Sequence, residues 1–398
     1  MIRSRVYTSA LKRHLAEERQ MVFVGGPRQV GKTTTCRDMG TIYLNWDNED
    51  HREVIVAGAG AVARHADLDR LTGQPPVIVF DELHKYRRWR QFLKGFFDTY
   101  GSRTRIIVTG SSRLDQYRRG GDSLMGRYFP LRMHPFSVAE LADPELPAGP
   151  VRLPRPVAEE DWRALGEHGG FPEPFTRRTA TFTTRWRGLR RTQLLREDIR
   201  DLTRIQELDQ LGMLERLLAE SSGEKLVYSS LARAVRVSEN TVRSWIATLC
   251  SLHHGFVVRP WYQSITRALR KEPRWYLRDW SGLAEPGKRF ETLCACHLLK
   301  AVEGWSDLGL GAFELRYIRD SQGRQVDFVV VRDGKPWFLV EATLSDDPLS
   351  PALKYFQAAT GAEHAFQIVA ELPYVSVDAF TRRDPVAVPA RTLLSQLL

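Results

Sequence analysis

The sequence predicts a multidomain α/β protein whose N-terminal part is a parallel sheet flanked by helices. Short apolar runs that end in polar residues recur at residues 22–24, 77–80 and 106–108, and helical patterns separate them. Such runs are typical of strands buried on both faces of a parallel sheet. A chain of 398 residues also exceeds the size of one ordinary core. We therefore expect two or three domains.

Composition narrows the class of protein. Apolar residues make up 42% and charged residues 27% of the chain, and no run approaches the roughly 18 apolar residues of a membrane span. Residues 1–5 are followed by no signal-type apolar stretch, so we expect a cytoplasmic protein without membrane contact. The net charge of +10 agrees with a polyanionic partner, although an arginine-rich coding bias gives the same charge.

The four cysteines are scattered along the chain and suggest reduced thiols rather than a disulfide framework. Cys294 and Cys296 precede His297 in a helical pattern, but no second ligand pair lies nearby in the sequence. We therefore do not expect a zinc site there.

A glycine-bounded loop follows the first apolar run and matches the phosphate-binding pattern G-x-x-x-x-G-K-[ST] over Gly26 to Thr33. Gly26 and Gly31 let consecutive backbone N–H groups turn inward, Lys32 reaches the β- and γ-phosphates, and Thr33 offers a hydroxyl to Mg²⁺. The expected nucleotide contacts are Gly26, Pro27, Arg28, Gln29, Val30, Gly31, Lys32, Thr33 and Thr34. The sequence therefore predicts binding of ATP or GTP with Mg²⁺.

Two acids end the second apolar run, at Asp81 and Glu82. Ligands of open α/β sheets bind at the carboxyl ends of strands, so we expect Asp81 to join the Mg²⁺ shell and Glu82 to polarise the attacking water. The third run ends in Ser111 and Ser112. Ser111 is a candidate γ-phosphate contact, and an N-cap of the next helix is the equal alternative.

The motifs at 26–33, 43–47, 80–82, 109–112 and 124–127 together resemble the prokaryotic AAA-type ATPases that carry a C-terminal domain of unknown function. The resemblance implies ATP hydrolysis. It covers the first ~140 residues. It also implies that Arg127, in Leu-x-Gly-Arg, completes the phosphate site as a catalytic residue. Whether Arg127 acts on its own chain or on a neighbour is open, as is the oligomeric state, and a surface salt bridge is the alternative.

We expect the ATPase core at 1–145, a helical and winged-helix region at 146–265 and a third domain at 266–398. Arginines are interleaved with apolar residues between 177 and 204, which predicts a basic amphipathic helix. A solvated helix face is favoured there over a surface that follows a phosphate backbone.

The pattern of residues 229–259 predicts two short helices, a turn and a strand. This segment resembles a winged helix-turn-helix. Asn240, Thr241, Arg243 and Ser244 would then face duplex DNA. The alternative is a module that only packs against the ATPase.

Near the C-terminus, residues 326–331 and 337–341 form a predicted hairpin around Asp333 and Gly334. A three-residue loop with a bulge at Gly334 puts Asp327, Glu341 and Thr343 on one face. A two-residue loop would split them across the sheet.

This constellation is similar to restriction-endonuclease-like folds of the PD-(D/E)xK type, in which a helix Glu, a strand Asp and a Glu-x-Lys triplet hold Mg²⁺. Glu291, Asp327 and Glu341 match and are the candidate second metal site. Thr343 stands where the lysine belongs, so the resemblance implies a degenerate domain. Lys354 is a candidate replacement, and the sequence leaves this open.

The sequence as a whole predicts a Mg²⁺-dependent ATPase switch that couples its nucleotide state to DNA or a protein partner. An ATP-licensed nuclease and a nucleotide-dependent protein scaffold are the alternatives.

Overall fold

The computed structural model describes residues 3–70, 74–110, 124–199, 207–262 and 272–398. The chain divides into two compact units. The N-terminal unit comprises residues 1–134 and 144–146, and the C-terminal unit comprises residues 135–143 and 147–398. Each is described by itself.

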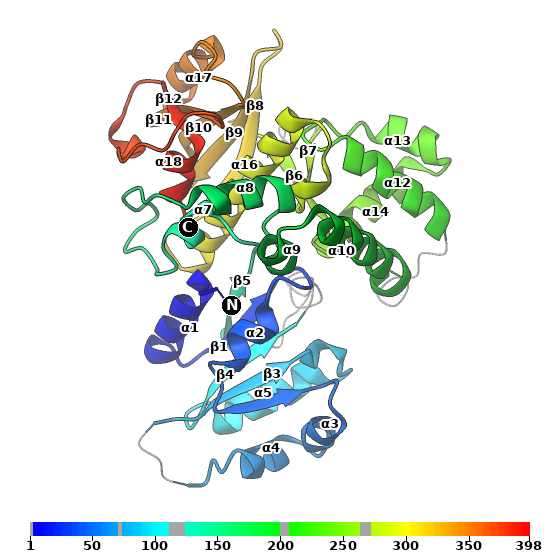
Figure 1. The fold of residues 1–398 in the computed structure, drawn as a ribbon. Coiled ribbons are helices and arrows are strands. Elements are labelled where there is room, and N and C mark those ends of the chain that lie inside the picture. Colours follow the sequence, from blue (N-terminus) through cyan, green and yellow to red (C-terminus); the bar gives the residue numbers. More distant parts are fainter. Residues whose placement is uncertain (1–2, 71–73, 111–123, 200–206, 263–271) are drawn as a thin grey trace. The chain divides into compact units, whose positions relative to one another are not determined.

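The N-terminal unit contains the expected parallel sheet (Figure 1). Its strands are β1 (Met21–Gly25), β2 (Ile42–Asn45), β3 (Val77–Asp81), β4 (Arg105–Thr109) and β5 (Tyr128–Arg132). They pair in the order β2-β3-β4-β1-β5, and every pairing is parallel. Strand β4 therefore lies between the strand that leads into the glycine loop and the strand that carries the two acids.

Five helices accompany this sheet within the described residues. They are α1 (Val6–Glu17), α2 (Lys32–Arg37), α3 (Glu49–Val56), α4 (Ala59–His65) and α5 (Trp89–Tyr100). The Asn48 side chain caps α3 by accepting a hydrogen bond from the backbone N–H of His51.

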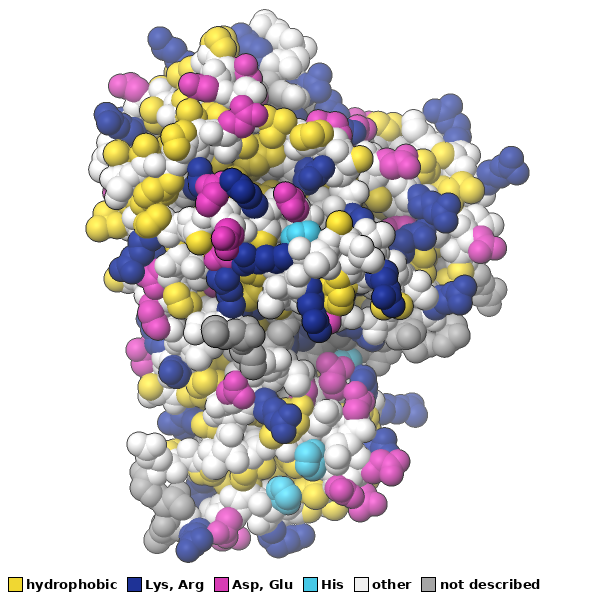
Figure 2. Space-filling model, in the orientation of Figure 1, with side chains coloured by type: hydrophobic (Ala, Val, Ile, Leu, Met, Phe, Trp, Pro, Cys, Tyr) yellow, Lys and Arg dark blue, Asp and Glu magenta, His cyan; other side chains and the backbone are white. Residues whose placement is uncertain are grey.

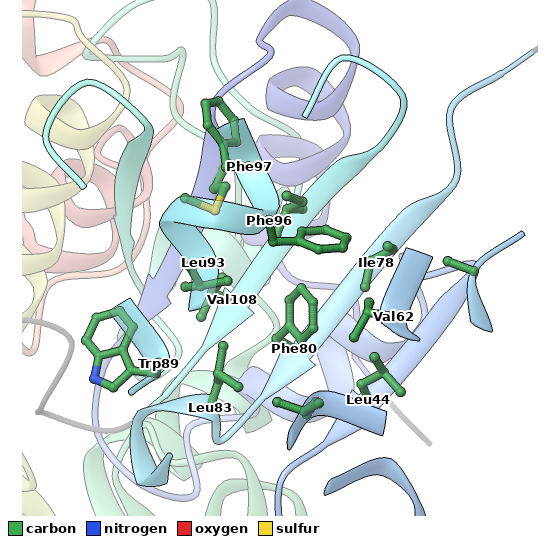
Figure 3. Close-up of a cluster of buried hydrophobic side chains, with 14 of the residues drawn as sticks. Leu44, Val62, Ile78, Phe80, Leu83, Trp89, Leu93, Phe96, Phe97 and Val108 are labelled. Carbon is green, nitrogen blue, oxygen red and sulfur yellow. The ribbon is translucent and has the colours of Figure 1, made fainter. Parts of the chain in front are cut away.

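The core on one face of the sheet forms because alternate strand residues point toward α3, α4 and α5 (Figure 3). Phe80 packs edge-on against Phe96 of α5, and Leu44, Ile78 and Val108 surround them. All five side chains are buried. Full burial of one such side chain contributes about 1.5–3 kcal/mol, so this layer holds the strand ends in fixed positions.

The C-terminal unit begins earlier than expected because residues 135–143 pack into it. Lys300 Nζ lies 2.5 Å from Glu140 Oε2, and both side chains are almost fully buried. The backbone N–H of Val138 donates to His297 Nε2 at 3.1 Å. These contacts attach the segment after β5 to the C-terminal unit, whereas we expected the boundary at residue 145.

The helices of the C-terminal unit are α7 (Val138–Ala142), α8 (Glu159–His168), α9 (Pro172–Arg177), α10 (Ala180–Gln193), α12 (Leu208–Glu220), α13 (Tyr228–Val235), α14 (Glu239–Ser251), α16 (Pro286–Asp307), α17 (Pro351–Thr360) and α18 (Ala390–Ser395). A π-helical turn, Leu194–Asp198, continues α10. Helix α13 begins at Tyr228, one residue before the expected start at 229. Ser238 caps α14 by accepting from the backbone N–H of Thr241.

A mixed sheet of seven strands joins the expected second and third domains. Its strands are β6 (Gly255–Pro260), β7 (Arg274–Leu277), β8 (Phe313–Arg319), β9 (Gln325–Arg332), β10 (Lys335–Thr343), β11 (His364–Val369) and β12 (Val386–Pro389). Their order is β12-β11-β10-β9-β8-β6-β7. Because β6 pairs with both β7 and β8, the expected boundary at 265 falls within one sheet rather than between domains.

The β9–β10 hairpin puts Asp327 and Glu341 on one face, as expected, but it does so with a two-residue loop and a bulge within β10. Its loop has two residues, Asp333 and Gly334, and both have positive φ. A bulge then inserts Trp337, so that Val331 pairs with Pro336 but Val330 pairs with Phe338. This shift restores the register that brings Asp327 and Glu341 to the same face.

The four cysteines are unpaired, as predicted. Within the described part of the chain, no helix is long and apolar enough to cross a bilayer.

Candidate functional site

The glycine loop between β1 and α2 has the backbone that the motif predicts. Gly26 has φ 137°, and a Cβ there would collide with the carbonyl oxygen of Met133. Gly31 has φ 100° and is the N-cap residue of α2. Both positions therefore require glycine, Gly26 for two separate reasons.

The loop is also anchored from outside. Arg5, which precedes α1, donates from Nη1 to the carbonyl of Val30 at 2.7 Å and from Nη2 to that of His134 at 2.6 Å. The arginine is buried. Sequence reasoning missed Arg5, because it lies 25 residues from its partner in the loop.

Lys32 lies at the start of α2 and is buried. Its ammonium folds back over the loop and donates to the carbonyls of Gly26 at 2.9 Å and Pro27 at 2.7 Å. Thr33 and Thr34 follow on the exposed side of the helix, and Gln29 is also exposed. The Lys32 ammonium therefore lies against the loop, where a phosphate chain would carry its charge.

Asp81 is the centre of the site. It ends β3, is 2% exposed, and accepts a hydrogen bond at Oδ2 from Thr33 Oγ1 at 3.0 Å. Tyr43 of β2 donates to the same oxygen at 2.6 Å, and Thr109 of β4 donates to Oδ1. Three hydroxyls from three elements thus fix one carboxylate.

Sequence reasoning predicted Thr33 and Asp81 but missed Tyr43 and Thr109 as site residues. The available signal was a hydroxyl on each strand that flanks β3, at Thr109, which ends β4, and at Tyr43, two residues before the end of β2. Burial and the neighbouring Asp81 charge raise the pKa of Tyr43, so its hydroxyl stays protonated and remains a donor. Burial likewise raises the pKa of Cys36, with Asp81 adding to the effect, so this nearby thiol is not a nucleophile.

Glu82 follows Asp81 in an uncommon conformation. Its φ of 56° and ψ of 21° lie in the left-handed region, which a glutamate rarely adopts. The Glu82 carboxylate lies 3.4 Å from Lys85 Nζ and 3.8 Å from His84 Nε2. Lys85 also pairs with Asp47 at 2.6 Å. Glu82 is therefore turned away from the strand direction and held by a lysine three residues on.

Ser111, the candidate γ-phosphate contact, lies outside the described residues.

Arg127 does not lie where the phosphate site needs it within its own chain. Its carbonyl accepts from the backbone N–H of Met21, the first residue of β1, whereas the glycine loop follows the other end of that strand. At about 3.3 Å per residue, these two edges of the sheet are about 13 Å apart. The guanidinium is bound to both carboxylate oxygens of Asp98, at 2.7 and 3.0 Å. Within its own chain Arg127 therefore forms the salt bridge that was the alternative reading, and action on a neighbouring chain stays a prediction.

The second constellation lies in the C-terminal unit, where Glu291 of α16, Asp327 of β9 and Glu341 of β10 come close enough to affect one another's charge. Burial, and then the Asp327 charge, raises the pKa of Glu291 to about 7 and that of Glu341 to about 8. Arg274 of β7 donates to Asp327 Oδ1 at 3.1 Å and to Glu291 Oε1 at 3.4 Å. The predicted grouping is present, but it contains an arginine.

This arrangement does not fit the expected second metal site. Among the described residues, no group of three or more His, Cys, Asp or Glu side chains is arranged to hold a metal ion. The Arg274 guanidinium holds Asp327 Oδ1 and Glu291 Oε1, two of the carboxylate oxygens that Mg²⁺ would need. Thr343 bonds to the carbonyl of Ser345 at 3.2 Å, and Lys354 is exposed on α17. Neither residue supplies the missing lysine.

The helix-turn-helix segment presents most of its expected contact residues to solvent. Asn240, Arg243 and Ser244 of α14 are exposed. Thr241 is half-buried and bonds to the Ser238 cap at 2.8 Å. The inward residues Val242, Trp245, Ile246 and Leu249 are buried, as the periodicity predicts.

The basic helix has both packed and exposed arginines, and several of the packed ones hold the unit together. Arg187 donates to the carbonyl of Ser281 at 2.7 Å, and Arg190 lies 3.9 Å from the centre of the Phe171 ring. Arg191 pairs with Glu215 at 2.5 Å. These three side chains are only partly exposed and take part in packing, whereas Arg185 and Arg196 are exposed and lie on a solvated face.

Two family models match the chain. Residues 18–142 match an AAA domain, and residues 159–285 match a domain of unknown function, DUF8612. The uncharacterized protein Rv2008c of Mycobacterium tuberculosis is 25% identical over 351 residues, which cover 85% of this chain and 73% of that protein. The uncharacterized protein Mb2031c of Mycobacterium bovis matches to the same extent.

Solved structures give weaker likenesses. The Orc1 protein of Aeropyrum pernix, solved in complex with DNA, is 14% identical with a TM-score of 0.31, covering 73% of this chain and 90% of that one. PCH-2 of C. elegans is 15% identical with a TM-score of 0.23, covering 61% of this chain and 67% of that one. Scores of this size do not establish a shared fold over the full chain.

The match over residues 18–142 agrees with the glycine loop, the acidic strand end and the parallel sheet of the N-terminal unit. Residues 18–142 are thus similar to an AAA domain and carry the glycine loop and the acidic strand end of a P-loop nucleotide site.

Proposed function

We propose that this chain is a Mg²⁺-dependent ATP hydrolase that works as a switch, coupling its nucleotide state to DNA or to a protein partner. The observation that carries the catalytic part is the hydrogen bond of 3.0 Å between Thr33 Oγ1 and Asp81 Oδ2. It joins the end of the acidic strand to the start of the helix after the glycine loop. Hydroxyl and carboxylate oxygens are ligands that Mg²⁺ favours, so these two residues fit the ion.

The side chains divide the work as follows. Lys32 leaves the carbonyls of Gly26 and Pro27 and binds the β- and γ-phosphates, which offer stronger acceptors to its ammonium. Thr33 and Asp81 hold Mg²⁺, which when bound neutralises charge on the phosphate oxygens. Glu82 accepts a proton from the attacking water or orients that water. This last role requires Glu82 to separate from Lys85.

The test of the catalytic part is steady-state release of phosphate from ATP by the purified full chain. Lys32→Ala removes the phosphate contact, and Glu82→Gln keeps the shape of the base but removes its proton affinity. Both variants are expected to lose at least about 100-fold in turnover, within the range that positioned acid–base groups contribute. Normal turnover by Lys32→Ala would exclude the proposal, whereas GTP-only turnover would change the nucleotide but not the mechanism.

Exposed arginines support DNA as the coupled partner. Arg233 of α13, Arg236 in the turn, Arg243 of α14 and Arg259 of β6 are all exposed. Figure 2 shows basic side chains prominent over the region of α12, α13 and α14. The structure of Orc1 in complex with DNA gives no further support at its TM-score. Clustered arginines attract a phosphate backbone by releasing its counterions, and such binding weakens as salt rises.

The coupling is tested by measuring ATP turnover and duplex binding at 50 and 300 mM salt. Arg236→Ala combined with Arg243→Ala removes two charges of the exposed set, and Arg185→Ala combined with Arg196→Ala removes two exposed charges elsewhere. We expect the first pair to lose duplex binding at least about tenfold more than the second. Turnover that ignores DNA, with no salt-sensitive binding, would replace the DNA partner by a protein partner while leaving the ATPase intact.

A further inference from the structure

The carboxylate cluster of the C-terminal unit already contains a cation. Arg274 is 5% exposed, and its Nη1 reaches both Asp327 and Glu291. Asp327 accepts a further bond at Oδ2 from the backbone N–H of Ala342 at 3.2 Å, and Tyr276 donates to Glu291 Oε1 at 2.7 Å. A guanidinium cannot lose its charge in a protein, so this cation is permanent.

The cluster is also covered by the chain. The segment between α12 and α13 runs beside β7, where the N–H of Gly223 donates to the carbonyl of Trp275 at 2.7 Å and that of Trp275 donates to Glu224 at 3.0 Å. A Cβ at Gly223 would lie 3.3 Å from the Glu291 carboxylate oxygens. The Gly223 backbone therefore lies against the Glu291 carboxylate and covers it on this side.

Both closing elements belong to the same stretch of sequence. Arg274 and Gly223 fall within residues 159–285, whereas the three acids fall after residue 285. Ser222 strengthens the junction, because its Oγ lies 2.9 Å from Thr292 Oγ1 of α16 and accepts from the backbone N–H of Leu277 at 3.1 Å. Residues 159–285 thus contribute the Arg274 guanidinium and the backbone at Gly223, which lie against the acids of α16, β9 and β10.

We propose that Arg274 is a built-in replacement for the divalent cation of this cluster, so that the C-terminal unit binds no metal there and the cluster instead fastens residues 222–277 to the sheet. A metal ion bridging Asp327 and Glu291 would need Asp327 Oδ1 and Glu291 Oε1, which the guanidinium holds, and two cations at that separation repel each other. The unit is then a binding module without phosphodiester chemistry. This inference does not depend on the proposed ATPase function, because it concerns residues outside the N-terminal unit.

The first test measures the binding of Mn²⁺ to the nucleotide-free full chain by calorimetry. The affinity and stoichiometry of wild type are compared with those of Asp327→Asn. Wild type and Asp327→Asn are expected to bind Mn²⁺ equally, because any Mn²⁺ that binds the chain lies outside this cluster. A Mn²⁺ site in wild type that Asp327→Asn abolishes would overturn the proposal. This comparison does not require any change to Arg274.

The second test removes the guanidinium. Arg274→Met leaves buried carboxylates without their cation and is expected to lower the Tm by on the order of 10 °C. Arg278→Met is the matched control, because Arg278 directly follows β7, is also buried, and pairs with Glu303 rather than with the cluster. With the guanidinium absent, 10 mM Mn²⁺ is expected to raise the Tm of Arg274→Met by about 3 °C or more.

The expected pattern is a Mn²⁺ response in Arg274→Met alone, and loss of that response when Asp327→Asn is added. Equal responses in Arg274→Met and Arg278→Met would refute the idea that the guanidinium stands in the place of the ion.

Discussion

Removing the Tyr43 hydroxyl is the sharpest test of how the ATPase site is held together. Asp81 is fixed by hydroxyls from Thr33, Tyr43 and Thr109. If Thr33 turns toward Mg²⁺ when nucleotide binds, Asp81 Oδ2 keeps Tyr43 as its donor. Tyr43→Phe removes that donor and leaves the ring in place. We therefore expect Tyr43 to act as a positioning residue for Asp81.

The size of the effect follows from the bond. A hydrogen bond to a charged group contributes about 1.5–3 kcal/mol. If about half of this contribution is realised only in the transition state, turnover falls about 3- to 12-fold, since 1.36 kcal/mol corresponds to tenfold in rate. The apparent affinity for Mg²⁺ should fall as well, because Asp81 is less well oriented. The affinity for nucleotide without Mg²⁺ should not change.

The assay is ATP turnover at several Mg²⁺ concentrations, with binding of a fluorescent nucleotide measured in EDTA. Tyr86→Phe is the matched control, because Tyr86 stacks on Trp46 at 4.8 Å and its hydroxyl makes no hydrogen bond with a described residue. The pKa of Tyr43 is raised by burial and Asp81, so the ratio of wild-type to Tyr43→Phe turnover should stay constant from pH 7 to about 9.5. Equal turnover in Tyr43→Phe and wild type, or equal losses in the two variants, would refute the positioning role.

Three further changes test other parts of the molecule. Lys85→Met frees Glu82 from an ion pair of 3.4 Å and should raise ATP turnover by up to about fivefold, while unchanged turnover would mean that the pair imposes no restraint. Glu140→Gln leaves the buried Lys300 ammonium unpaired and should cost about 3–5 kcal/mol of unfolding free energy, and adding Lys300→Met should recover part of that loss in denaturant titrations. Glu341 has its pKa raised from 4.5 to about 8, so the folded state keeps a proton that the unfolded state loses, and stability falls as pH rises through this window. The Tm of wild type should therefore fall more steeply between pH 6 and 8.5 than that of Glu341→Gln, and parallel curves would contradict the shift.

The sequence alone determined the local chemistry of the nucleotide site. The glycines, Lys32 and Thr33 are contiguous, and their roles follow from backbone conformation and charge within one loop. Asp81 was predictable because an apolar run that ends in an acid is a buried strand whose carboxyl end faces ligand. Local motifs of this kind carry their meaning in residue spacing.

The order of the strands in the sheet decided which side chains contact Asp81, which the sequence could not predict. Tyr43 and Thr109 reach Asp81 only because β2 and β4 both pair with β3. The position of Arg127 follows from the same kind of constraint, since the parallel pairing of β5 with β1 puts it at the amino edge of the sheet. Pairing partners are set by long-range packing, which no spacing along the chain records.

In the C-terminal unit, the sequence correctly brought Glu291, Asp327 and Glu341 together but not their counter-ion. The face shared by Asp327 and Glu341 depends on one bulge at Trp337, because a shift of one residue moves a side chain to the other face of a sheet. Arg274 enters the cluster from a strand 53 residues before Asp327. Local sequence therefore supplied the acids, and only tertiary structure decided that a guanidinium, brought by strand pairing, would balance their buried charge.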